Sequence, residues 1–170
     1  SNPSPVIQED GSVMMIFKGR AHTENGKYSD MALGIAYAPN IEGPYTVLNN
    51  DQPIFQVDGQ GEAEDPFLWK DFKGYHAIFK DHVAKYTGER GGGVMAHSTD
   101  GVHWTVDKDP KAYSRAVEWE DGKMEMQGQL ERPFLFFENG KATHAFFATM
   151  DGPGGFENAT KSWNMVIPLK

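Results

Sequence analysis

The sequence predicts an all-β protein built from repeated antiparallel sheets, of the kind that form the blades of a β-propeller. Its 170 residues contain 19 glycines, 10 prolines and 12% aromatic residues, a composition typical of short strands joined by tight turns. One motif also recurs three times: a polar residue, a proline, an apolar run, a turn with glycine and a second apolar run. The best helical candidate, residues 113–126, shows no clear apolar stripe, so we expect no long helix.

The repeat is marked first by its prolines. Pro3, Pro66 and Pro133 lie 63 and 67 residues apart and each precedes an apolar run. A turn dipeptide follows each run: Asp10-Gly11, Lys73-Gly74 and Asn139-Gly140. Glycine and asparagine tolerate the positive φ that tight hairpins demand, so each unit is predicted to open with a β-hairpin.

A second half of the repeat follows in the first two units. Residues 32–38 lead to 43–47, and residues 94–101 lead to 104–106; each reads as a strand, a turn and a strand opened by an aromatic residue. The third unit has room for one further strand at 162–169. A unit is therefore a four-stranded meander, or three strands at the C-terminus, which is the form of a propeller blade.

We expect one partial propeller domain over residues 1–170, with blades at about 1–60, 61–126 and 127–170. Propellers close their ring with about 4–8 blades, so three blades leave apolar faces and strand edges exposed. The sequence starts at Ser1 without an initiator methionine or a signal-peptide pattern. Either further blades lie outside this sequence, or two copies associate.

Composition narrows the classes of partner and cofactor. The formal net charge of -8 argues against nucleic acid or an anionic membrane surface as partner, because both reward clustered lysine and arginine. The chain has no cysteine, which excludes disulfides and cysteine-ligated zinc. Its six histidines show no metal-ligand spacing, so we predict no cofactor, while a cation at an acidic channel mouth stays open.

The repeat predicts where functional side chains gather. The innermost strands of a propeller start at one mouth of the channel, which would bring together Asn2, Glu64-Asp65 and Glu131-Arg132. The second strand of each hairpin runs back to that mouth and ends at Arg20 in the first unit and at Asp81-His82 in the second. Carboxylates from separate blades would then share one concave site with cations.

Paired carboxylates in such a site suit the hydrolysis of glycosidic bonds, in which one acid protonates the leaving oxygen and one carboxylate activates water or attacks carbon. We predict Asp65 and Glu131 as the catalytic pair. The predicted substrate-binding residues are Glu64, Arg132, Arg20, Asp81, His82 and Trp69. The structural alternatives are that Asp65 and Glu131 only cap their strands or pair with Arg132, and that Trp69 packs between blades.

At these motifs the sequence resembles the five-bladed propeller glycoside hydrolases of families 43 and 32. The blade-opening segments 2–3, 64–69 and 131–133 carry the resemblance, together with the outer-strand turns at 41–45 and 98–104. In such enzymes an Asp base, a second Asp that tunes pKa and orients substrate, and a Glu acid come from different blades. Asp65 resembles the second Asp and Glu131 the acid, whereas Asn2 stands where an Asp would be needed, so the base has no match here.

The resemblance implies a glycoside-hydrolase-like protein acting on plant or algal oligosaccharides, of which this chain holds the C-terminal three blades without the base. It also implies a bacterial protein, extracellular or periplasmic as a whole. Two alternatives stay open: a non-catalytic carbohydrate-binding propeller, and a protein-interaction propeller that would show a large apolar patch on a ring face and no sugar affinity.

Overall fold

The structure, a computed structural model, describes residues 2–48, 52–55, 62–152 and 154–169 and is all-β over these ranges. This confirms the predicted fold class. No helix long and apolar enough to cross a membrane occurs in the described ranges. The predicted blade boundary near residue 60 lies outside the described residues.

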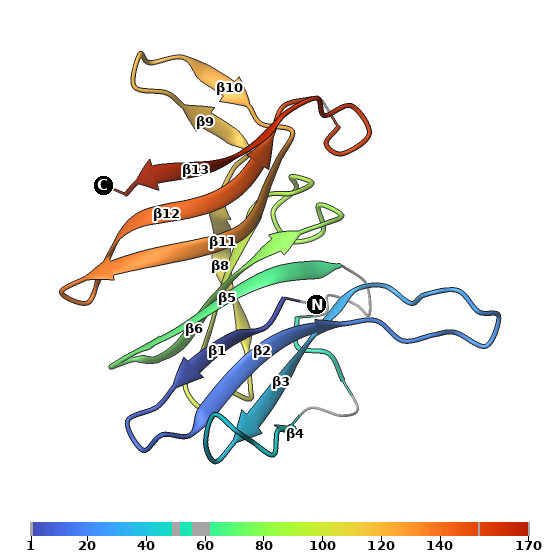
Figure 1. The fold of residues 1–170 in the computed structure, drawn as a ribbon, viewed down its shortest axis with the longest axis vertical. Coiled ribbons are helices and arrows are strands. Elements are labelled where there is room, and N and C mark those ends of the chain that lie inside the picture. The colour runs from blue at the N-terminus through green and yellow to red at the C-terminus, as the bar shows by residue number, and fades with distance from the viewer. Residues whose placement is uncertain (1, 49–51, 56–61, 153, 170) are drawn as a thin grey trace.

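Three antiparallel sheets follow one another along the molecule (Figure 1). The first contains β1 (Ser4–Ile7), β2 (Val13–Gly19), β3 (Ala32–Ala38) and β4 (Thr46–Val47). The second contains β5 (Ala63–Asp71), β6 (Gly74–Asp81), β7 (Gly93–Ser98) and β8 (Thr105–Tyr113). The third contains β11 (Gln129–Glu138), β12 (Lys141–Met150) and β13 (Ser162–Pro168). Each sheet has the strand order of a meander, as predicted for propeller blades.

The segment that held the best helical candidate forms a two-stranded hairpin instead, β9 (Ala116–Glu118) and β10 (Met124–Met126). A tight turn at Gly122, with φ of 80°, closes it. The segment has no apolar stripe of helical spacing, in agreement with its forming a hairpin and no amphipathic helix. β8 is also longer than the predicted strand at 104–106 and reaches Tyr113.

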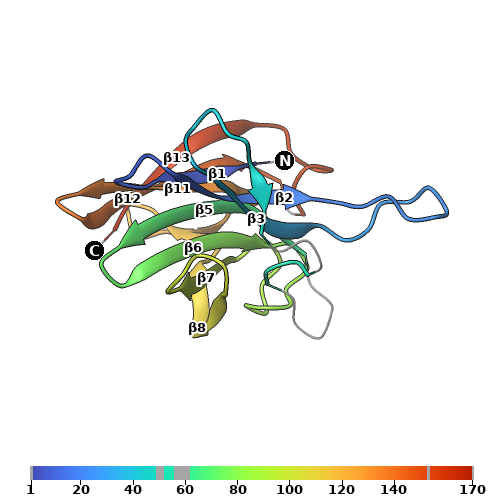
Figure 2. The ribbon, with the colours of Figure 1, turned by 90° about the horizontal axis from the view of Figure 1, so that it is seen from below.

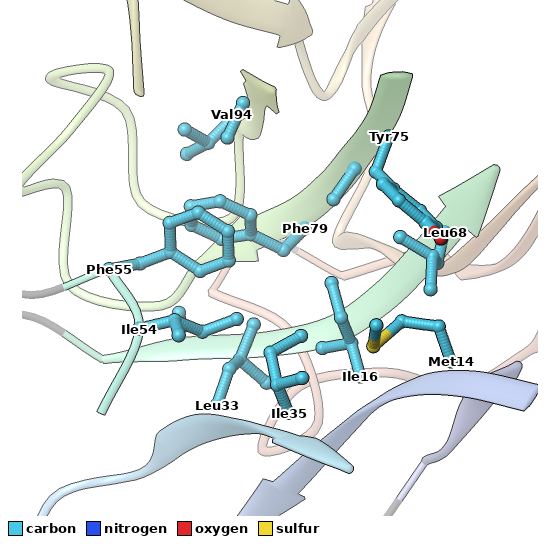
Figure 3. Packing of buried hydrophobic residues seen from close by; sticks show 13 residues of the cluster. Met14, Ile16, Leu33, Ile35, Ile54, Phe55, Leu68, Tyr75, Phe79 and Val94 are labelled. Carbon is cyan, nitrogen blue, oxygen red and sulfur yellow. The ribbon is translucent and has the colours of Figure 1, made fainter. Parts of the chain in front are cut away.

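The first and second sheets pack face to face around a continuous apolar core (Figure 3). Ile16 and Leu33 from the first sheet and Phe79 from the second are at most 1% exposed. Phe55, on the connection between the sheets, stacks on Phe79 with ring centroids 4.4 Å apart. Burial of these large side chains fixes how the two sheets sit on each other, since each contributes about 1.5–3 kcal/mol.

The second and third sheets meet at a smaller core. Leu130 and Phe147 of the third sheet and Val117 of the β9–β10 hairpin are buried there, and the Tyr113 ring lies edge-on to Phe147 at 4.8 Å. The innermost strands β1, β5 and β11 are thereby neighbours on one side of the stack, as Figure 2 shows from below. Their starting ends meet at one edge.

Among the described residues, the outer face of the third sheet is apolar and largely uncovered. Phe134, Phe146 and Val166 stand opposite one another across β11, β12 and β13, and they are 50%, 37% and 49% exposed. The matching position to Phe134 in the second sheet, Phe67 directly after Pro66, lies on the face that the third sheet packs against, with its ring 5.1 Å from that of Phe134. The uncovered face of the third sheet therefore corresponds to the face by which the second sheet packs on the third.

We expect this face to make the chain self-associate, with the uncovered sheet packing on a sheet of a second copy. Phe136→Glu, which places a charge at a position 45% exposed on that face, should weaken self-association by about tenfold or more because a buried unpaired charge is costly. Phe72→Glu is the matched control, since Phe72 is 92% exposed at a hairpin turn. Sedimentation velocity over a concentration series measures both, and a monomeric parent chain would contradict the expectation.

Candidate functional site

The repeated prolines shape the site through a pair of β-bulges. The register of β5 with β6 shifts between Glu64 and Phe67, and that of β11 with β12 shifts between Glu131 and Phe134. Proline has no N–H to give to a sheet and is tolerated at such bulges. Asp65 and Arg132, the residues before the two prolines, both adopt a left-handed backbone with φ of 52°. The same local conformation is thus built twice, at the heads of two neighbouring inner strands.

The bulges bring consecutive side chains into one pocket. In a regular strand, successive side chains point to opposite faces, yet Glu64 and Asp65 both line the pocket, as do Glu131 and Arg132. The pocket has a volume of about 430 Å³. Its other lining residues are Asn2, Lys18, Lys80, His82, Arg90, Gln129, Gly154, Phe156 and Glu157.

A ladder of alternating charges crosses the pocket from the first sheet to the third. Lys18 Nζ lies 2.9 Å from Glu64 Oε2, and Lys80 Nζ lies 2.5 Å from Glu64 Oε1. Lys80 Nζ also donates to both Glu131 oxygens at 2.8 Å. Lys80 is 2% exposed, and a charge buried this deeply needs a compensating partner, which the ionised Glu64 supplies while both Glu131 oxygens accept hydrogen bonds from the same amino group.

Asp65 lies beside this ladder and connects the three inner strands. The Asn2 side-chain amide donates to one of its oxygens, and the backbone N–H of Arg132 donates to the other at 3.1 Å. Asp65 is 3% exposed and also forms a hydrogen bond with Glu131. The three blade-opening motifs therefore meet on this one carboxylate, as the repeat predicted.

The two glutamates on Lys80 have opposite electrostatic environments. Burial would raise the pKa of Glu64, but hydrogen bonds and charge from Lys80 and Lys18 outweigh it and lower that pKa to about 2. Burial raises the pKa of Glu131, and Asp65 raises it further against the opposing effect of Lys80. The two environments favour the charged form of Glu64 and the protonated form of Glu131, relative to an ordinary glutamate.

Of the remaining predicted site residues, His82 lies in the pocket and Arg20 outside it. His82 Nδ1 is 2.9 Å from Glu64 Oε1, so it forms part of the charge ladder. Arg20 is exposed and pairs with Glu62 at 3.2 Å. Glu62 also accepts a hydrogen bond from the backbone N–H of Met31, so Arg20 pairs with a carboxylate that does not line the pocket.

Asp81 does not reach the pocket. It is fully buried, and its carboxylate accepts hydrogen bonds from the backbone N–H groups of Lys85, Tyr86 and Thr87 at 2.8–2.9 Å. Lys80 lines the pocket, and the next side chain along a strand points to the opposite face, so the Asp81 carboxylate organises the loop that follows β6. The structure gives Asp81 a structural role.

Trp69 also lies away from the pocket, between the second and third sheets. Its ring stacks on His76 at 5.3 Å and lies 6.0 Å from the Phe137 ring. Trp69 therefore packs between blades, which the sequence analysis gave as the structural alternative to a sugar-binding role.

Sequence reasoning missed Tyr113, which lies at the end of β8. Its hydroxyl is buried and has no hydrogen-bond partner among the described residues. Burial raises its pKa well above the usual value, and the charges of Asp65 and Glu131 add to the effect. An ideal Cβ at Gly93 would lie 2.0 Å from the Tyr113 ring, so a glycine at residue 93 leaves the room that this ring occupies. No local sequence pattern marks Tyr113, and its place becomes visible only through its contact with Gly93.

Sequence reasoning also missed the side of the pocket formed by two connecting loops. Arg90 comes from the β6–β7 loop, and Phe156 and Glu157 come from the β12–β13 loop. No group of three or more metal-ligating side chains is found in the described ranges. The absence of a cofactor stays a prediction.

The comparisons with known proteins place this fold. No protein-family model and no curated protein match the sequence. The structure is similar to a solved glycoside hydrolase, with a TM-score of 0.66 and 11% identity over 99% of this chain and 45% of that one. The same values hold for a solved BT0996 RGII complex.

A third structure, the Bombyx mori GH32 beta-fructofuranosidase BmSUC1, solved as a mutant in complex with sucrose, matches with a TM-score of 0.55 and 16% identity. The match covers 96% of this chain and 32% of that one. This chain therefore spans less than half the length of these proteins. Together the three similarities confirm, for the fold, the predicted resemblance to propeller glycoside hydrolases.

The low pKa of Glu64 predicts an acid-sensitive contribution to stability. A carboxyl whose pKa falls on folding stabilises the protein above its unfolded value, about 4.5, and loses that contribution as the pH falls toward 2. The shift corresponds to about 3 kcal/mol. We expect Glu64→Gln to be less stable than the parent chain at neutral pH, with the gap closing as the pH falls below 4.

Urea unfolding at several pH values measures this gap. Glu24→Gln, in the exposed β2–β3 loop, is the control and should track the parent chain throughout. A gap between Glu64→Gln and the parent chain that stays constant with pH would contradict the assigned electrostatics.

Proposed function

We propose that this chain carries part of the active site of a glycoside hydrolase acting on oligosaccharides, with Glu131 as the general acid. Further blades outside this chain would complete the ring and supply the base. The single observation that carries the proposal is the buried Glu131–Asp65 pair at the common mouth of the inner strands, beside the Lys80 charge ladder.

Glu131 has the properties that an acid for glycosidic oxygen needs. Its raised pKa keeps a proton available nearer neutral pH than an ordinary glutamate does. Protonation of the leaving oxygen by Glu131 would let the C–O bond break while the pair of electrons leaves with that oxygen. Asp65, next to it, supports the proton on Glu131.

Lys80 would respond to that proton transfer. Once Glu131 has given up its proton it becomes a buried anion, and the Lys80 amino group, 2.8 Å from both of its oxygens, compensates the new charge. Glu64 and Lys18 hold Lys80 in place from the other side. The ladder thus offers the acid a charge partner in its ionised state.

The fold comparisons support the general class of this proposal. One neighbour is named a glycoside hydrolase and another is a fructofuranosidase solved with sucrose. The partial coverage of those proteins agrees with a site completed by further blades.

A second candidate function is binding of carbohydrate without catalysis. Asn2 favours it, because this amide occupies the position where the resemblance expects the base and donates its hydrogen bond to Asp65. The pocket would then hold a sugar through its polar side chains and never activate water.

We expect Glu131→Gln to lower kcat for oligosaccharide hydrolysis by about 10²–10⁴-fold in the protein that carries the complete ring, because general acid catalysis contributes that much. Sugar binding should survive, since glutamine has nearly the same shape. Reducing-sugar release and calorimetric titration on the same panel of oligosaccharides measure the two effects. Glu138→Gln, at the far end of β11, is the matched control. Unchanged turnover would remove Glu131 from the mechanism, and binding without turnover in the parent protein would favour the second candidate.

A further inference from the structure

The charges that line the pocket differ in whether they have a partner. Lys18 and Lys80 are neutralised by Glu64 and Glu131 at 2.5–2.9 Å. In the described part of the chain, no hydrogen bond or ion pair reaches the guanidinium of Arg90 or of Arg132. Arg90 and Arg132 therefore line the pocket that holds the proposed acid, without an ion-pair partner among the described residues.

These two arginines come from different sheets. Arg132 sits on the bulge of β11, directly after Glu131, and its left-handed backbone lets it share the pocket with that residue. Arg90 comes from the loop between β6 and β7, which Asp81 organises through backbone hydrogen bonds. Both are exposed in the pocket wall, so a ligand can reach them without displacing an existing ion pair.

The local charge balance contrasts with that of the whole protein. The chain carries an excess of eight acidic residues over basic ones. In the pocket, however, four cations (Lys18, Lys80, Arg90 and Arg132) stand against four carboxyl groups (Glu64, Asp65, Glu131 and Glu157), of which Glu131 is the proposed proton carrier. The two pocket cations that have no partner among the described residues are the two that present planar guanidinium groups. Guanidinium binds carboxylates and other oxyanions through two parallel hydrogen bonds, a geometry that a neutral sugar hydroxyl cannot match.

We propose that the pocket recognises acidic sugars, with the guanidinium groups of Arg132 and Arg90 binding the carboxylate of a uronic acid unit. This inference rests on the proposed function for its carbohydrate substrate and adds the chemical class of that substrate. The carboxylate would bind beside Glu131, so the acidic unit occupies the sugar position next to the bond that Glu131 serves.

Calorimetric titration of the chain with a galacturonic acid trimer and with the matching neutral galactose trimer tests the proposal. We expect the acidic trimer to bind at least about tenfold more tightly, the worth of one charge-assisted hydrogen-bonded pair. Its affinity should fall as sodium chloride rises, because screening weakens the contact. Equal affinity for both trimers, or tighter binding of the neutral one, would overturn the proposal.

The variants Arg132→Gln and Arg90→Gln should each lose about tenfold in affinity for the acidic trimer and leave any affinity for the neutral trimer unchanged. Lys141→Gln removes the same charge at the opposite end of the third sheet and is the matched control. Equal losses in all three variants would reduce the effect to net charge and overturn the assignment.

Two further measurements separate the possible failures. Inorganic phosphate, titrated alone, should bind far more weakly than the acidic trimer, and equal binding would show that the sugar contributes nothing, which overturns the acidic-sugar assignment. Hydrolysis is followed separately by reducing-sugar release. Tight binding of the acidic trimer without turnover supports this inference while the proposed hydrolysis fails, and turnover of neutral substrates alone does the reverse.

Discussion

The buried amino group of Lys80 is the interaction on which the pocket depends. It is 2% exposed and lies within 2.8 Å of carboxylate oxygens from both Glu64 and Glu131. Through Glu64 the same series of ion pairs continues to Lys18 in the first sheet, so one ion-paired ladder joins all three sheets at their common edge. Replacing a buried ion pair with apolar residues is often neutral for stability, whereas removing one partner is costly because the others stay buried and unpaired. The ladder is therefore better understood as a device that fixes the position of carboxylates than as a source of net stability.

The ladder is possible because the backbone breaks strand alternation at two places. A left-handed residue followed by proline at positions 65–66 and 132–133 places neighbouring side chains in the same pocket. Such a backbone conformation costs of order 1 kcal/mol or more for a residue with a Cβ. The packing of the inner strands β1, β5 and β11 against one another holds both bulges in place. The apolar cores between the sheets thus stabilise a polar site that would not form on an isolated hairpin.

Much of this arrangement could be predicted from the sequence, because each repeat is marked by short local motifs. Proline and glycine mark the bulges and turns directly, and blade geometry then brings Asp65 and Glu131 to one mouth. Sequence reasoning misplaced residues whose side-chain direction is set at the end of a strand. Asp81 follows Lys80 by one residue, yet its carboxylate points into its own loop because three backbone N–H groups lie there. Arg90 and Tyr113 were missed because their nearness to the site depends on loop paths and on a glycine at residue 93, which no periodic pattern encodes.

The net charge of the protein and the local charge of the pocket act at different distances. At low ionic strength, an excess of eight acidic residues slows the approach of an anion over a range of about 30 Å, and salt at about 0.15 M screens this repulsion beyond about 8 Å. Contacts with Arg90 and Arg132 act at hydrogen-bond distance, where screening is weaker. Salt therefore acts on an acidic sugar in two ways: it speeds association by screening the net charge, and it speeds dissociation by weakening the guanidinium contacts. The fall in affinity expected above requires the second effect to be the larger one. A neutral sugar would show neither trend, because its contacts with the pocket are hydrogen bonds between uncharged partners or with only one charge.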